Sequence, residues 1–212
     1  MNVWKEIDES RSLEFLNGSL VEHFGPYVQP LDESEEAGLF YGEKEFNFDY
    51  EQFEIKATDV PALSCAKYVI LKLNGQEYGE SLNLKIPTNG ILSIGAFQQM
   101  LMENDCIVEE QYDTSLEELA EMLSTGDCVV CYVSTVALDH PDFLLSPLET
   151  GDCLVAVTGL DLSNPGNIQV ILIRFDTMDG FSMAYGWNHF LRAWKSSGRY
   201  CLVMGGEIVR WK

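Results

Sequence analysis

The stretch that constrains the fold of this chain most strongly runs from Gly151 to Met204. It begins with two dense apolar runs, LVAVTGL and IQVILIRF, continues with an aromatic segment, WNHFLRAW, and ends in RYCLVM. Short runs rich in β-branched residues and bounded by turn residues are typical of strands, whereas the aromatic segment repeats at helical spacing. The stretch therefore predicts a helix at 185–194 and strands at 154–158, 168–175 and 199–204.

Two helices and a strand are predicted ahead of this stretch. ILSIGAFQQMLMEND has apolar residues at helical spacing, which predicts a helix from about Ser93 to Glu103. A second helix is predicted from Asp113 to Leu123, with Thr114 and Glu117 as its capping box and Gly126 at its end. The run DCVVCYVST then predicts a buried strand. Helices that precede a group of antiparallel strands indicate the α+β class.

Residues 1–88 are predicted to form an acidic, β-rich region. Alternating aromatic residues in FNFDY predict a strand with one buried face and one acidic face. YVILKL at 68–73 precedes an Asn-Gly turn sequence and SLNLKI at 81–86 follows it, which predicts a β-hairpin. This region forms a separate domain or adds strands to the core of residues 89–212, and the sequence leaves both options open.

Charge is distributed very unevenly along the chain. Residues 1–150 contain 29 acidic and 7 basic residues, whereas residues 151–212 contain 5 acidic and 6 basic residues, and the whole chain has a net charge of −21. Contacts with the phosphates of DNA, RNA or an anionic membrane require lysine and arginine, so the composition argues against these partners. The acidic half keeps the protein soluble, binds a basic partner, or imitates nucleic acid.

The cysteines and the N-terminus point to a cytoplasmic protein without a metal or cofactor. No apolar run approaches the roughly 18 residues of a membrane span, and the charged N-terminus lacks the apolar centre of a signal peptide. Disulfides are rare in that compartment. Cys128 and Cys131 form a C-x-x-C pair, but a strand would point them to opposite faces, and no second ligand pair accompanies them.

Four segments carry a resemblance to a known family. GDCLVAVTGLD is similar to a segment in which that family has a Gly-His pair, then a hydrophobic strand, then Gly-Tyr-Asp. VILIRFDTMDG is similar to the family's next strand, which ends in an Asn/Asp-Pro turn. WNHFLRAW is similar to a Phe-x-x-x-Trp helix, and RYCLVM to the strand after it. In this order, residues 89–204 resemble the papain-like double-glycine cysteine peptidases, which trim bacteriocin leaders. The resemblance implies a papain-like fold, with helices packed on an antiparallel sheet, in a bacterial or phage protein.

The resemblance also locates the catalytic positions of that family. The chemistry needs a thiolate, an imidazole to take its proton, and a carboxylate or amide to orient the imidazole. The family's cysteine position, at the start of the first helix of this region, falls near Leu92, and its histidine position falls on Cys153. The orienting residue is retained as Asp176. The resemblance therefore implies a pseudo-peptidase in which no catalytic residue remains functional.

Three hypotheses for function follow. The leading one is a catalytically inactive, peptidase-like protein that binds a protein or peptide partner, which is basic if the acidic half makes the contact. The second is an acidic protein that imitates nucleic acid and inhibits a nucleic-acid-binding enzyme. The third is an active thiol peptidase with an unrecognised dyad, although His189 and His140 are expected to be structural or surface histidines, and Cys106 does not head a helix.

Overall fold

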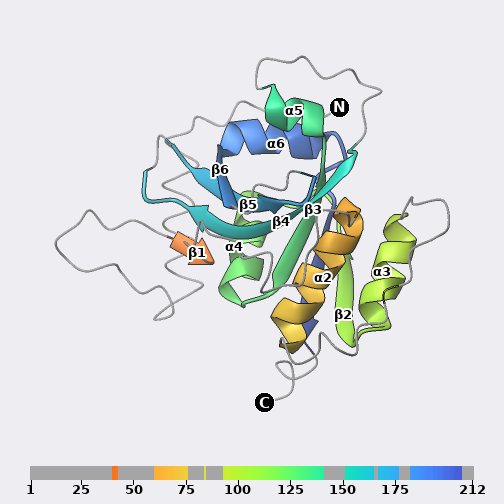
Figure 1. Ribbon diagram of the computed structural model, residues 1–212. Coiled ribbons are helices and arrows are strands. Elements are labelled where there is room, and N and C mark those ends of the chain that lie inside the picture. The colour runs from red at the N-terminus through yellow and green to blue at the C-terminus, as the bar shows by residue number, and fades with distance from the viewer. Residues whose placement is uncertain are drawn as a thin grey trace.

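The computed structural model describes residues 40–42, 60–75, 84, 93–140, 151–164, 167–176 and 182–206. These residues form an α+β architecture, in which a seven-stranded antiparallel sheet has helices on both faces (Figure 1). The helices and strands are β1 (Phe40–Gly42), α2 (Pro61–Asn74), α3 (Ile94–Met102), β2 (Cys106–Gln111), α4 (Leu116–Ser124), β3 (Cys128–Val133), α5 (Thr135–Asp139), β4 (Cys153–Asp161), β5 (Gln169–Arg174), β6 (Ser182–Gly186), α6 (Trp187–Lys195) and β7 (Cys201–Gly206).

The strands pair in the order β2-β7-β3-β4-β5-β6, and β1 also pairs with β4. Every pair is antiparallel. β3 pairs with the first half of β4, from Cys153 to Val157, and β1 pairs with the second half, from Gly159 to Asp161. Gly42 allows this close approach, because its φ is +84° and a Cβ atom there would lie 2.2 Å from the carbonyl oxygen of Thr158.

Two hydrophobic cores lie on opposite faces of the sheet. The α2–α3 core lies between those two helices and the sheet and includes the fully buried Phe97. The α4–α6 core lies on the other face under α4, α5 and α6 and includes the fully buried Trp194. Cys128 belongs to the first core and Cys131 to the second, which confirms that the C-x-x-C pair points to opposite faces of a strand.

The first arm of the predicted β-hairpin is helical, so that prediction was wrong. α2 includes residues 68–73 and ends where Gly75, with a φ of +86°, donates its backbone N–H to the carbonyl of Leu71 at 2.9 Å. The Asn-Gly pair therefore ends a helix instead of turning a hairpin. α2 is buried along most of its length, so its apolar residues form a near-continuous run that resembles a buried strand. The second arm lies outside the described residues except for Leu84.

The described parts of residues 1–88 share a core with the rest of the chain. β1 pairs with β4, and α2 packs on β4, β7 and α3, so both contact elements of residues 89–212. In Figure 1, α2 lies beside α3 in front of the sheet. The predicted strand over FNFDY lies outside the described residues.

The two helices predicted between residues 93 and 123 are confirmed as α3 and α4. Ser93 caps α3 by accepting a backbone N–H at 3.2 Å. α4 has a capping box, but it uses Ser115 and Glu118, one residue later than predicted. Thr114, the predicted cap, is buried instead, and its hydroxyl oxygen lies 3.5 Å from the Sγ of Cys201. Of these two neighbouring hydroxyl residues, Thr114 is therefore buried in the core and Ser115 caps the helix.

The strands predicted near residues 127–135, 154–158, 168–175 and 199–204 are confirmed as β3, β4, β5 and β7. The helix predicted from residue 185 begins two residues later as α6, because Ser182–Gly186 forms β6, a short strand at the edge of the sheet. Gly205 and Gly206 continue β7, where they pair with β2.

Candidate functional site

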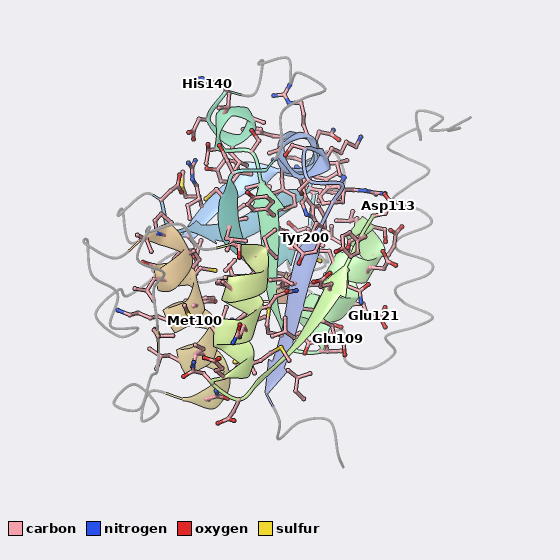
Figure 2. The ribbon with its side chains drawn as sticks, turned by 90° about the vertical axis from the view of Figure 1, so that its right-hand side faces the viewer. Met100, Glu109, Asp113, Glu121, His140 and Tyr200 are labelled. Carbon is pink, nitrogen blue, oxygen red and sulfur yellow. The ribbon has the colours of Figure 1, made fainter. Side chains whose placement is uncertain are left out.

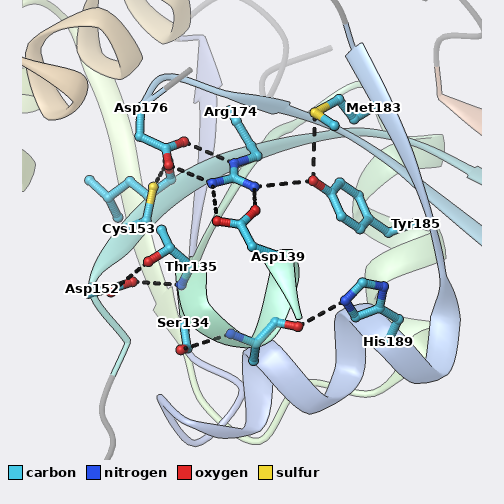
Figure 3. Close-up of polar contacts among 12 residues, drawn as sticks. Ser134, Thr135, Asp139, Asp152, Cys153, Arg174, Asp176, Met183, Tyr185 and His189 are labelled. Atoms are coloured by element: carbon cyan, nitrogen blue, oxygen red, sulfur yellow. Dashed lines mark hydrogen bonds and ion pairs between the residues drawn. The ribbon is translucent and has the colours of Figure 1, made fainter. Parts of the chain in front are cut away.

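Two of the three family-equivalent positions meet at one end of the sheet. β4 and β5 are antiparallel with Val155 opposite Arg174, so the register brings Cys153, two residues earlier, opposite Asp176, two residues later. Side chains two residues apart on a strand point to the same face. The thiol of Cys153 donates a hydrogen bond to the carboxylate of Asp176 (Figure 3).

Arg174 is the centre of this site. Its side chain is only 4 % exposed, and it donates from Nε to Asp176 Oδ1 at 3.0 Å and from Nη2 to Asp176 Oδ2 at 2.6 Å. The same guanidinium donates to both carboxylate oxygens of Asp139 and, at 3.3 Å, to the hydroxyl of Tyr185 (Figure 3). Two carboxylates therefore neutralise and orient one buried cation.

Short contacts fix α5 over this end of the sheet, where it supplies Asp139. Asp152, just before β4, accepts hydrogen bonds from the backbone nitrogen and the hydroxyl of Thr135, both at 2.8 Å. Ser134 caps the helix by accepting the backbone N–H of Ala137 at 3.4 Å. The carboxylate of Asp139 therefore reaches Arg174 from the end of a short helix whose start is anchored to the residue before β4.

The two described histidines contact α5 and α6, away from the Cys153 thiol. The Nε2 of His189 lies 2.9 Å from the carbonyl oxygen of Ala137, and its ring packs edge-on against Tyr185 at 5.4 Å between centroids. His140 ends α5, and its carbonyl accepts a hydrogen bond from Arg192 at 3.3 Å. Within the described residues, the carboxylate of Asp176 is paired with the guanidinium of Arg174.

The surroundings keep Cys153 protonated and Asp176 ionised. Burial, and after it the negative charge of Asp176, raise the pKa of the Cys153 thiol, and the charge of Arg174 offsets only part of this effect. Burial also raises the pKa of Asp176, but hydrogen bonds and the positive charge from Arg174 outweigh burial, so this pKa is lowered. A protonated thiol without a neighbouring base is a poor nucleophile.

Leu92, the third family-equivalent position, lies outside the described residues. α3 begins at Ile94 and packs on β2 and α2, whereas α2 and α4 are the described helices that pack on β4. α2 begins with Pro61 and has no cysteine in its first turn. Cys65 follows, fully buried, and burial, with a smaller effect from Cys153, raises the pKa of its thiol. The described start of α2 therefore supplies no activated cysteine.

Sequence reasoning missed Arg174, although the sequence contains a signal for it. Arg174 is the only lysine or arginine between Lys85 and Arg192, and it stands in an apolar strand two residues before Asp176. A lone cation in a buried strand needs a carboxylate partner, because an unpaired buried charge is strongly destabilising. The spacing places that partner on the same face of the strand.

We expect iodoacetamide to alkylate Cys153 in the folded protein roughly 100-fold more slowly than in the urea-unfolded protein at pH 7.5, because only the thiolate reacts. Mass spectrometry of the Cys153 peptide over time measures the rate. Asp176→Asn removes the neighbouring negative charge and should accelerate the labelling. Rapid labelling of the native wild-type protein, together with loss of function in Cys153→Ala, would contradict this prediction and favour an active thiol peptidase.

No family model, no curated protein and no solved structure matches this chain. In the described ranges, no group of three or more histidine, cysteine, aspartate or glutamate side chains is arranged to hold a metal ion. No helix in that part of the chain has the length and apolarity to cross a membrane.

Proposed function

We propose that this protein is a catalytically inactive, papain-like protein that acts by binding a protein or peptide partner. The contact between Asp176 and Arg174 carries the proposal, because the carboxylate that would orient an imidazole instead holds a guanidinium. The neighbouring Cys153 thiol, whose pKa is raised, adds to this argument. The meeting of Cys153 and Asp176 at neighbouring strand ends, with α2 packed on β4, supports the papain-like arrangement.

A surface over β2 and α4 supports a basic partner. Exposed acidic side chains on the α4 side of β2, on α4 and between them are Glu109, Asp113, Glu118 and Glu121, three of which are labelled in Figure 2. No lysine or arginine occurs between Lys85 and Arg174, and Arg199, the nearest described cation, is paired with Asp113. A surface of one charge sign accelerates association with a partner of the opposite sign and selects against others.

Tyr112 places an exposed aromatic ring across β2 from this acidic surface, on the side of the sheet that α3 covers. Its side chain is 66 % exposed, its ring lies 5.0 Å from the ring of Tyr200, and its hydroxyl donates to Glu110 at 2.5 Å. A tyrosine ordered by a ring contact and a hydrogen bond loses little entropy on binding, and its ring face attracts lysine and arginine. These features favour a partner that presents basic side chains.

Capture of proteins from a lysate of the source organism on the immobilised full-length chain tests the proposal. The captured protein is then purified, and its Kd is measured by titration calorimetry for the wild type and for Glu118→Lys/Glu121→Lys, with Glu118→Gln/Glu121→Gln as the control. We expect the charge reversal to weaken binding by roughly 10-fold or more, and the neutral control to have a smaller effect. Equal affinities for all three proteins would contradict a partner at this surface.

The concentration of described acids on β2 and α4 also favours the alternative of a nucleic-acid mimic, because a contiguous acidic surface is what such a protein requires. Competition separates the two functions. If the captured protein binds nucleic acid, and duplex DNA displaces this chain from it, the mimic is correct. If the partner does not bind nucleic acid and DNA has no effect, the peptide-binding proposal holds.

A further inference from the structure

Cys131 and Cys201 face each other directly across the β3–β7 ladder. The neighbouring residues Tyr132 and Tyr200 form a hydrogen-bonded pair, with the Tyr132 nitrogen donating to the Tyr200 oxygen at 3.3 Å. Hydrogen-bonded and non-hydrogen-bonded pairs alternate along an antiparallel ladder, so Cys131 and Cys201 form the closer, non-hydrogen-bonded kind with Cα atoms about 4.5 Å apart. That separation lies within the range that a disulfide bridges.

The two thiols are already in contact. A hydrogen bond joins them, and both side chains are fully buried in the α4–α6 core. The hydroxyl oxygen of Thr114 lies 3.5 Å from the Sγ of Cys201. The hydrogen bond from Cys131 lowers the pKa of the Cys201 thiol, and burial raises it by less. Cys201 is therefore the more acidic thiol of the pair and the one that reacts first with an oxidant. Cys131 is placed to react second, with the oxidised Cys201.

Cys201 also stands at the end of a strand, next to a turn. It is the first residue of β7, and it follows a turn in which Gly198 and Arg199 both have positive φ. On its other side it pairs with Gln111, the last residue of β2, which is exposed. Strand ends open locally at a lower free-energy cost than strand centres, so a small oxidant gains access here without global unfolding.

We propose that Cys131 and Cys201 form a reversible intramolecular disulfide when the protein meets a peroxide. The Cys201 thiolate attacks one peroxide oxygen and becomes a sulfenic acid, and the hydroxide that leaves takes up a proton to give water. The Cys131 sulfur then attacks the Cys201 sulfur, and the sulfenic oxygen leaves as a second water. Two thiols and one hydrogen peroxide thus give one disulfide and two waters, and a dithiol reductant reverses the oxidation.

The disulfide would enclose the part of the chain that forms the candidate site. Cys153, Arg174 and Asp176 all lie between residues 131 and 201, as do α5 and α6. A covalent link across β3 and β7 restrains the unfolded state of this long segment and stabilises the folded one. This inference is independent of the proposed binding function, because it concerns only the chemistry of the pair.

Oxidation of the folded full-length protein with hydrogen peroxide, followed by alkylation under denaturing conditions and peptide mapping, tests the inference. We expect two of the six cysteines to escape alkylation, a mass decrease of about 2 Da, and a peptide pair that joins Cys131 to Cys201. The melting temperature should rise by roughly 5–15 °C and return after treatment with dithiothreitol.

Cys128→Ser is the matched control, because Cys128 lies on the same strand and is buried, but it pairs with Met204. This variant should still form the disulfide, whereas Cys131→Ala and Cys201→Ala should not. Mapping of the wild-type protein decides the question even if an alanine variant fails to fold. Six alkylated cysteines after oxidation, or a disulfide between any other two cysteines, would overturn the inference.

Discussion

Replacing Arg174 with methionine is expected to lower the free energy of unfolding by about 2–4 kcal/mol at neutral pH, as measured by urea denaturation. Methionine approximates the length of the apolar part of arginine but leaves Asp139 and Asp176 together without a cation. The two carboxylates are 49 % and 25 % exposed, so water compensates part of the loss, and the expected cost stays below that of a fully buried pair.

The same substitution should change how stability depends on pH. The pKa of Asp176 is lowered in the folded state, so its contribution to stability is complete above the pKa of an unfolded aspartate. That contribution is lost as the pH falls through the lower folded-state pKa. Arg174→Met removes the cause of the lowering, and the stability difference between wild type and variant should therefore shrink below about pH 4.

Lys195→Met is the matched control for this experiment. Lys195 is exposed at the end of α6, so losing its charge should change the free energy of unfolding by less than about 0.5 kcal/mol. If Arg174→Met were as mild as Lys195→Met at every pH, the network drawn in Figure 3 would contribute nothing to stability. Arg174 would then not be what holds the Asp176 carboxylate.

Much of the sheet was predictable, because its strands are short β-branched runs with turn residues between them. β4 and β5 are examples, and the match of their ends to a family pattern indicated that Cys153 and Asp176 were paired positions. The antiparallel register then brings the two side chains together without further information. Arg174 was missed because a search for the cysteine, histidine and aspartate of a cysteine peptidase does not consider arginine.

α2 and β6 could not be predicted for two different physical reasons. α2 is buried on several sides, which removes the polar stripe that distinguishes a helix from a buried strand, and Asn-Gly suits both a hairpin and a helix end. β6 is five residues long and runs directly into α6, so Tyr185 appeared to extend the helical pattern. In both cases tertiary contacts, which a local pattern does not contain, decide the structure.

Replacing Trp194 with alanine is expected to cost about 3–5 kcal/mol of the free energy of unfolding. Trp194 is fully buried in the α4–α6 core, and its ring lies 5.2 Å from that of Phe190. Its Nε1 donates to the backbone carbonyl of Tyr200 at 2.8 Å, which ties α6 to the residue before β7. Alanine would leave a large cavity and remove one of the two hydrogen bonds that the Tyr200 carbonyl accepts, the other coming from the Tyr132 backbone nitrogen, and the variant is expected to fold poorly.

Trp194→Phe separates the hydrogen bond from the packing and keeps the experiment interpretable. It retains an aromatic ring but removes the N–H, so we expect a loss of about 1–3 kcal/mol, with circular dichroism in urea as the measurement. Trp187→Phe makes the same change on the same helix at a partly buried position and should cost less. If the two phenylalanine variants were equally stable, the hydrogen bond from Trp194 to Tyr200 would not hold α6 against the sheet. α6 would then not support Arg174 through the contacts that His189 makes with Tyr185 and with α5.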